Sequence, residues 1–132
     1  MKTDSSGVLK IGNYIEAKID VLKEGTIRFD SNKNVIIQIR LKSKDALFLD
    51  IGFENFKLSD NAKVYAYSIN RKFIIGAFTH LNNRENLKFQ TAAVKGEEIV
   101  FEFNCPENEL KLNSVNISNI THYFKDWIGT SG

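Results

Sequence analysis

Short runs of alternating apolar and polar residues, separated by turn-forming residues at near-regular spacing, are the feature that most restricts the fold of this chain. Tyr14–Val21 is one example, in which Ile15, Ala17 and Ile19 alternate with charged residues. Alternation with a period of two places one side of a strand in a core and the other in water. No long segment has the apolar spacing of an amphipathic helix. The sequence therefore predicts a chain built mainly from strands.

Eight such runs can be marked along the chain. They are Tyr14–Val21, Asn34–Ser43, Ala46–Phe53, Ala62–Ile69, Lys72–Thr79, Leu87–Val94, Glu97–Asn104 and Leu110–Phe124. Asn70 and Arg71, between two of the runs, indicate a tight hairpin. Short strands with frequent turns are typical of an all-β fold, here a jelly-roll-like antiparallel β-sandwich of roughly eight to nine strands in two sheets. We expect residues 1–132 to form a single domain.

The charge pattern argues against nucleic acid as a partner. The chain has 18 basic and 16 acidic residues, for a net charge of +2, and the densest basic group is Arg40, Lys42 and Lys44. Three cations spaced along one strand are expected to form a solvated face. No apolar run is long enough to span a membrane. The N-terminus lacks the apolar segment of a signal peptide, so the chain is expected to be either cytoplasmic or part of a longer precursor.

Catalytic patterns are missing from the sequence. Cys105 is the only cysteine, which excludes an intrachain disulfide and a multi-cysteine zinc site, and it is expected to be a small buried apolar side chain. His80 and His122 lie outside any metal-binding or nucleophile motif, and no serine lies in a GxSxG turn. A Ser-His-Asp arrangement would have to be recognised from geometry. The sequence predicts no catalytic residue and a chain that is not an enzyme.

Two groups of residues are candidates for binding. Tyr65 and Tyr67 share one face of their predicted strand and, with Trp127, are a candidate stacking platform for a sugar; aromatic residues at strand spacing also often belong to a core. The carboxylates of Asp50, Glu54 and Asp60 gather around one predicted strand end and are weak candidates for calcium ligands, although they match no EF-hand. The sequence therefore predicts that the protein has no cofactor, with calcium as the alternative.

A larger pattern extends from Leu47 to Phe124. Its pieces are Leu47–Phe56, Asn61–Tyr67, Ile75–Asn83, Phe89–Glu102, Pro106 and Val115–Tyr123, in that order. Together they resemble the N-terminal β-sandwich region of secreted, lysyl-endopeptidase-like, trypsin-fold proteins of Bacteroidetes. The segment "GTSG" at 129–132 is similar to the start of the stretch that leads into their protease domain. Asp60 and Asn61 stand where that group has a Pro-Gly-like turn.

The resemblance implies a non-catalytic accessory or prodomain-like module, secreted or at the cell surface. Its partner would be an adjacent, covalently linked protease domain, and any catalytic triad would lie beyond Gly132. The residues themselves leave a second hypothesis open, in which the chain is a carbohydrate-binding or surface-adhesion sandwich that contacts a glycan or a surface protein. The carbohydrate-binding hypothesis predicts exposed, coplanar aromatic rings, with Tyr65 and Tyr67 as the best candidates for exposure.

Overall fold

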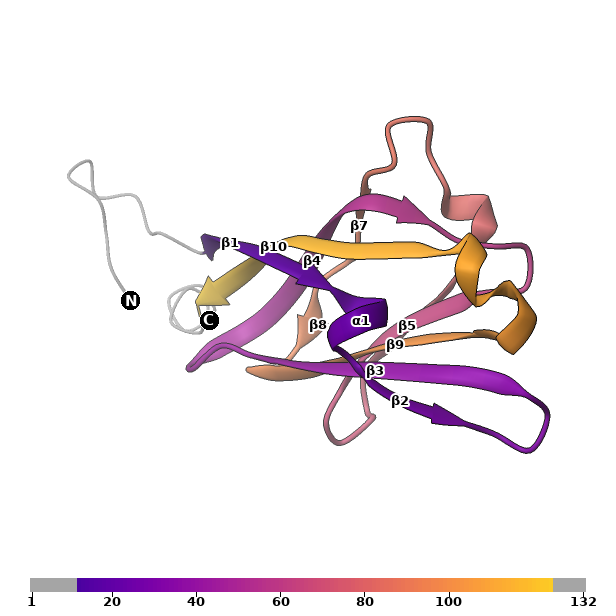
Figure 1. Ribbon diagram of the computed structural model, residues 1–132. Helices are drawn as coiled ribbons and strands as arrows, with labels where there is room; N and C mark the ends of the chain where they lie inside the picture. Colours follow the sequence, from indigo (N-terminus) through magenta and orange to yellow (C-terminus); the bar gives the residue numbers. More distant parts are fainter. Residues whose placement is uncertain (1–11, 125–132) are drawn as a thin grey trace.

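The computed structural model describes residues 12–124, which form ten strands and three short helical segments (Figure 1). The strands are β1 (Gly12–Asp20), β2 (Thr26–Phe29), β3 (Asn34–Lys42), β4 (Ala46–Lys57), β5 (Lys63–Ser68), β6 (Ile74–Phe78), β7 (Phe89–Gln90), β8 (Val94–Lys95), β9 (Glu98–Pro106) and β10 (Ser114–Phe124). The helical segments are α1 (Val21–Glu24) and the 3-10 turns η1 (His80–Asn82) and η2 (Glu107–Leu112). No helix among the described residues is long and apolar enough to cross a membrane.

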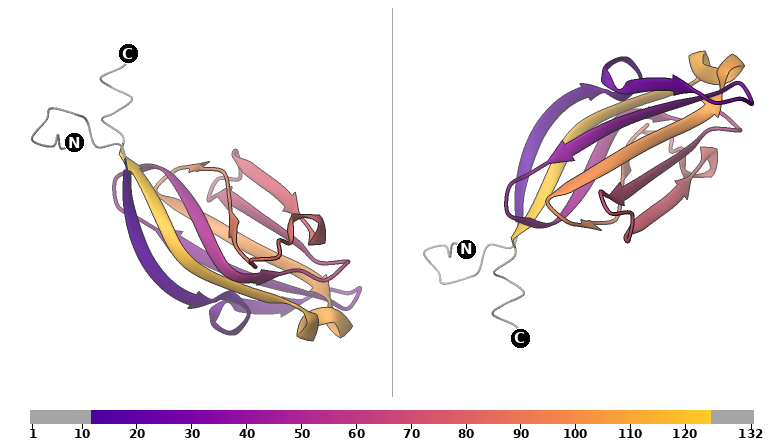
Figure 2. Two further views of the ribbon diagram at one scale, coloured as in Figure 1. Left: turned by 90° about the horizontal axis from the view of Figure 1, so that it is seen from above. Right: turned by 90° about the horizontal axis from the view of Figure 1, so that it is seen from below.

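The strands form two antiparallel sheets that pack face to face (Figures 1 and 2). The first sheet has the order β1-β10-β4-β7, with β8 also paired to β4, and the second has the order β2-β3-β9-β5-β6. Most successive strands cross from one sheet to the other, and β10 returns to lie beside β1. This is a jelly-roll arrangement with β2 added at one edge, and the predicted all-β antiparallel sandwich is confirmed.

Three segments differ from the sequence prediction. The strand β2 was not predicted, because it has only four residues and all four side chains are exposed. The predicted strand Leu87–Val94 is interrupted, so that only its ends pair with β4, as β7 and β8. Residues 107–112 form η2, because Pro106 starts a turn that the Asn113 side chain closes by donating to the Glu109 carbonyl at 2.8 Å. The long final strand therefore begins at Ser114.

The core lies between the two sheets and is rich in phenylalanine. Phe53 and Phe56 of β4 pack on Phe89 of β7, and Phe101 of β9 closes the cluster from the second sheet. The Phe53 and Phe101 rings are 5.0 Å apart between centroids, and those of Phe56 and Phe89 are 4.7 Å apart. Phe53 and Phe56 are three residues apart, so alternation alone would place them on opposite faces of β4. A register shift at Asn55, which has a φ of 48°, brings both rings to the inward face. The aromatic cluster thus joins the two sheets.

Cys105 is buried in this core, as predicted. Burial, with a smaller contribution from Glu109, raises the pKa of its thiol to about 11. Because the thiolate is the reactive form, we expect the native protein at pH 8 to react with a disulfide reagent at least ~100-fold more slowly than an ordinary thiol. Stopped-flow absorbance with 5,5′-dithiobis(2-nitrobenzoate) measures this. Protein unfolded in guanidinium chloride is the control, and equal native and unfolded rates would contradict the expectation.

The two ends of the described chain lie side by side. Gly12 begins β1 opposite Tyr123 of β10, and Asp20 at the far end of β1 is opposite Asn116. Both ends therefore leave the sandwich at the same end of the first sheet (Figure 2).

Candidate functional site

The two predicted tyrosines lie on the outer face of the second sheet, but Tyr67 is not exposed. Its ring is only 6% accessible, and the guanidinium of Arg71 lies 5.0 Å above its centroid. Its hydroxyl donates to Glu102 Oε1 at 3.0 Å and accepts from Gln38 Nε2 at 2.9 Å. Burial and then the Glu102 carboxylate raise the pKa of Tyr67. The exposure expected of Tyr67 is therefore wrong, because neighbouring polar side chains cover its ring.

The other predicted aromatic residues give no joint platform within the described residues. Tyr65 is half-buried, opposite Glu102 of β9 and Gly76 of β6. Trp127 lies outside the described residues. Of the predicted aromatic residues that the structure describes, Tyr65 alone is partly exposed.

The three predicted calcium ligands are not brought together. Asp50 and Glu54 both belong to β4, whereas Asp60 lies in the turn before β5 and lines a separate hollow with His80. Within residues 12–124 no group of three or more His, Cys, Asp or Glu side chains is placed to hold a metal ion. Asp50 is instead the centre of a hydrogen-bonded network described below.

One serine–histidine contact was not predicted. Ser43 Oγ, in the turn after β3, lies 2.6 Å from His122 Nδ1 on β10. His122 is buried between the sheets. A histidine in this position is shielded from any substrate, so the contact joins a turn to a strand and we assign it no catalytic role.

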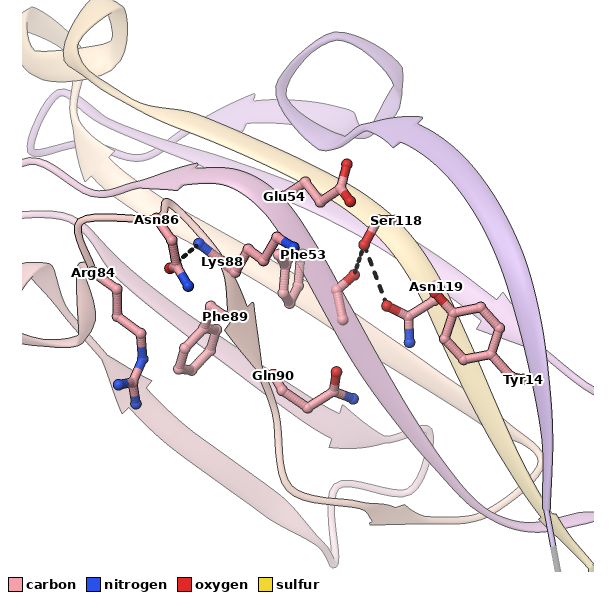
Figure 3. Close-up of a pocket in the computed structure, with 11 residues that line it drawn as sticks. Tyr14, Phe53, Glu54, Arg84, Asn86, Lys88, Phe89, Gln90, Ser118 and Asn119 are labelled. Carbon is pink, nitrogen blue, oxygen red and sulfur yellow. Dashed lines mark hydrogen bonds between the residues drawn. The ribbon is translucent and has the colours of Figure 1, made fainter.

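A hollow of about 420 Å³ lies on the outer face of the first sheet (Figure 3). Gly52 of β4 lies at its floor. Asn119 of β10 is paired opposite Gly52 on one side, and Gln90 of β7 on the other. The loop before β7, which projects from the sandwich in Figure 1, forms one wall. The sheet register therefore places two amide side chains across a residue that has no side chain.

The absence of a side chain at Gly52 shapes this hollow. A Cβ atom there would overlap Asn119 Oδ1 and would lie 2.7 Å from Gln90 Oε1. Both amide oxygens thus reach over the same backbone position from opposite strands. Only glycine leaves room for this close approach. Two hydrogen-bond acceptors consequently converge above Gly52.

Asp50 fixes the orientation of this polar group. Its two carboxylate oxygens accept from Gln90 Nε2 and from the Tyr123 hydroxyl, each at 2.8 Å, and Asp50 is only 7% exposed. The hydrogen bond to Asp50, together with burial, raises the pKa of Tyr123. Because Gln90 Nε2 donates a hydrogen bond to Asp50, Gln90 Oε1 faces Gly52.

Asn119 is held in a similar way. Ser118 Oγ lies 3.2 Å from Asn119 Oδ1 and 3.3 Å from the Gly52 carbonyl, and can donate to either. Asn119 is buried, so its amide has little freedom to turn. The Nδ2 group of Asn119 makes no hydrogen bond to a described residue, which leaves a donor beside the two acceptors. The hollow is therefore lined by oriented polar groups before any ligand arrives.

Tyr14 of β1 forms the opposite rim and is 66% exposed. It also lines a second hollow of about 550 Å³, which shares Tyr14, Glu54 and Ser118 with the first. Because they share these residues, the two hollows adjoin, and we term the combined surface across β7, β4, β10 and β1 the Gly52 groove. It combines a free aromatic ring with fixed amide groups, a combination that suits a polar ligand with apolar faces.

Comparison with known proteins does not place the chain in a family. No protein-family model matches it, and no curated protein matches it. Among solved structures, PliG of Aeromonas hydrophila, a periplasmic inhibitor of g-type lysozyme, is similar with a TM-score of 0.34 and 11% identity, over 86% of this chain and 86% of the inhibitor.

An exo-β-1,3-galactanase of Phanerochaete chrysosporium is also similar. A variant with β-1,3-galactotriose gives a TM-score of 0.34 and 11% identity over 87% of this chain. The enzyme with galactose gives 0.32 and 10% over 87%. This chain covers only 30% of the galactanase in each case. Similarities this remote carry no argument about ligand or activity, and the resemblance to lysyl-endopeptidase-like proteins stays a prediction.

Proposed function

We propose that this protein is a carbohydrate-binding β-sandwich that holds a saccharide in the Gly52 groove. The observation that carries the proposal is the convergence of Asn119 Oδ1 and Gln90 Oε1 above Gly52, beside the exposed ring of Tyr14. A sugar hydroxyl placed there can donate to one amide oxygen and accept from Asn119 Nδ2. The apolar face of a sugar ring can rest on Tyr14.

The network around Asp50 supports this function because it limits the cost of binding. Side chains that are ordered only on binding cost roughly 0.5–1.5 kcal/mol each. Gln90 is already held by Asp50, and Asn119 is already buried. Polar contacts fixed in advance therefore retain more of their binding free energy. The two adjoining hollows reach from β7 to β1, which suits a ligand that extends beyond one sugar ring.

The role beside a protease domain stays a prediction. A glycan-binding function is compatible with that role, because a secreted protease can carry a domain that attaches the protease to a glycan-covered surface. We also propose that the protein is secreted or attached to a cell surface. The Gly52 groove would bind glycans at that location.

The test is binding of the protein to an array of neutral and acidic plant, microbial and animal glycans, followed by calorimetry on the best soluble oligosaccharide. We expect Tyr14→Ala to weaken binding about 5- to 150-fold, since stacking on an aromatic ring contributes roughly 1–3 kcal/mol. The matched control is Tyr65→Ala, which removes a half-buried tyrosine from the outer face of the second sheet.

The two variants separate the two faces of the sandwich. Loss of binding with Tyr14→Ala and retention with Tyr65→Ala would support the Gly52 groove. The reverse result would move the site to the second sheet. An array on which no glycan binds above background would exclude the proposed function.

A further inference from the structure

The Gly52 groove carries opposite charge at its two ends. This observation deepens the proposed function and rests on it. Arg84 and Lys88 line the β7 end, on the loop that precedes that strand. At the β1 end the charged lining is mainly acidic, with Glu16, Asp20 and Glu24 against the single cation Lys18. Glu54 lies between the two ends and lines both hollows.

The two cations are available to a ligand. Both side chains are exposed, and neither forms an ion pair with another described residue. The loop that carries them is nevertheless fixed by its backbone, because the Phe56 amide donates to the Leu87 carbonyl at 2.7 Å and the Leu87 amide to the Arg84 carbonyl at 3.0 Å. Unpaired cations on a fixed loop offer an anion a defined place to bind.

The carboxylates at the β1 end repel a saccharide that carries negative charge along its whole length. Glu16 is opposite Asn119 in the strand register and lines the hollow at the β1 end. Glu24 accepts from the Asp20 amide at 2.7 Å, which keeps two further carboxylates close to that end. From β7 to β1 the groove crosses three strand spacings, about 14 Å. A ligand of that length meets both charge environments.

We infer that the ligand is a short saccharide with one anionic group, a carboxylate or a sulfate ester, and otherwise neutral sugar residues. The anionic group binds between Arg84 and Lys88, the adjoining sugar sits above Gly52, and the neutral part extends over Tyr14 toward Glu16. Repulsion by the carboxylates at the β1 end disfavours polyanionic chains. The charge distribution thus sets both the class of ligand and its direction in the groove.

The test is an array of matched saccharides of equal length that are neutral, carry one terminal uronic acid, carry one sulfate ester, or carry an acid on every residue. We expect one of the single-anion members to bind best, and the carboxylate and sulfate arms identify which. The double variant Arg84→Gln, Lys88→Gln is expected to reduce that preference about 3- to 10-fold. Lys63→Gln with Lys111→Gln is the control, because these exposed lysines line neither hollow.

Salt dependence and a change at Glu16 test the charge preference further. Raising the salt concentration from 20 mM to 500 mM should reduce the preference for the anionic saccharide, because exposed charges are screened. Glu16→Gln should improve binding of the fully acidic saccharide. Neutral saccharides that bind as well as the single-anion ones would overturn the inference but leave the proposed function standing. An acidic peptide that binds while all saccharides fail would overturn both.

Discussion

Replacing Phe101 with alanine is expected to lower the free energy of unfolding by about 3–5 kcal/mol. The Phe101 ring is fully buried and lies 5.0 Å from the Phe53 ring in the other sheet. Its removal would leave a cavity at the contact between the sheets, and neighbouring strands held by hydrogen bonds can collapse into it only in part. Urea unfolding followed by intrinsic fluorescence measures the change.

Two further variants keep this prediction testable even if the alanine variant does not fold. Phe101→Leu retains most of the apolar volume and should lose clearly less stability than Phe101→Ala. Phe73→Ala removes a ring that is 44% exposed in the turn after β5, and should cost less than about 1 kcal/mol. A loss for Phe101→Ala as small as that for Phe73→Ala would show that the aromatic cluster does not join the sheets.

Gly52→Ala is expected to destabilise the protein and to weaken glycan binding at least ~10-fold. The added methyl group would overlap Asn119 Oδ1, and overpacking of this kind costs roughly 1–3 kcal/mol. Alanine also reduces the entropy of the unfolded chain, which returns only about 0.4–1 kcal/mol. The steric cost therefore exceeds the gain. Binding falls because Asn119 and Gln90 must move to make room for the methyl group, which displaces the two amides proposed to hold the sugar.

The double variant Gly52→Ala, Asn119→Ala separates these two effects. Removing the Asn119 side chain relieves the overlap, so the double variant should be more stable than the sum of the single losses by about 1 kcal/mol or more. Glycan binding should stay lost, since one of the two amides is gone. Additive stability losses would contradict the close approach of Asn119 to Gly52. Full binding by Gly52→Ala would contradict the position of the ligand.

The alternation of residues was enough to predict the fold class, because inward and outward positions repeat along each long strand. Ile37 and Leu41 of β3, and Phe101 and Phe103 of β9, are buried as that pattern requires. Alternation fails where a segment is short or its surroundings are unusual. Ile27 lies on β2 but is exposed, since β2 is at the edge of its sheet. Leu110 and Leu112 fit a strand pattern but belong to η2, where Pro106 and Asn113 impose a turn.

The candidate site could not be read from the sequence in the same way. Gly52, Gln90 and Asn119 are far apart in the chain and meet only through the register of three strands. The single local signal is a glycine in the middle of a strand, which often marks a close approach of another group. Tyr65 and Tyr67 do share a face as predicted. Arg71 and Glu102 cover Tyr67 through tertiary contacts, which the sequence pattern does not reveal.

The side-by-side position of Gly12 and Tyr123 has a mechanical consequence. If tension were applied through the two flanking segments, it would pull β1 and β10 apart from the same end of the first sheet. The hydrogen bonds between these strands would then be loaded in succession, as in a zipper, and not all at once as in shear. The module would therefore yield at low force along this seam, whereas the β3–β9 and β5–β9 pairs of the second sheet would not be loaded directly.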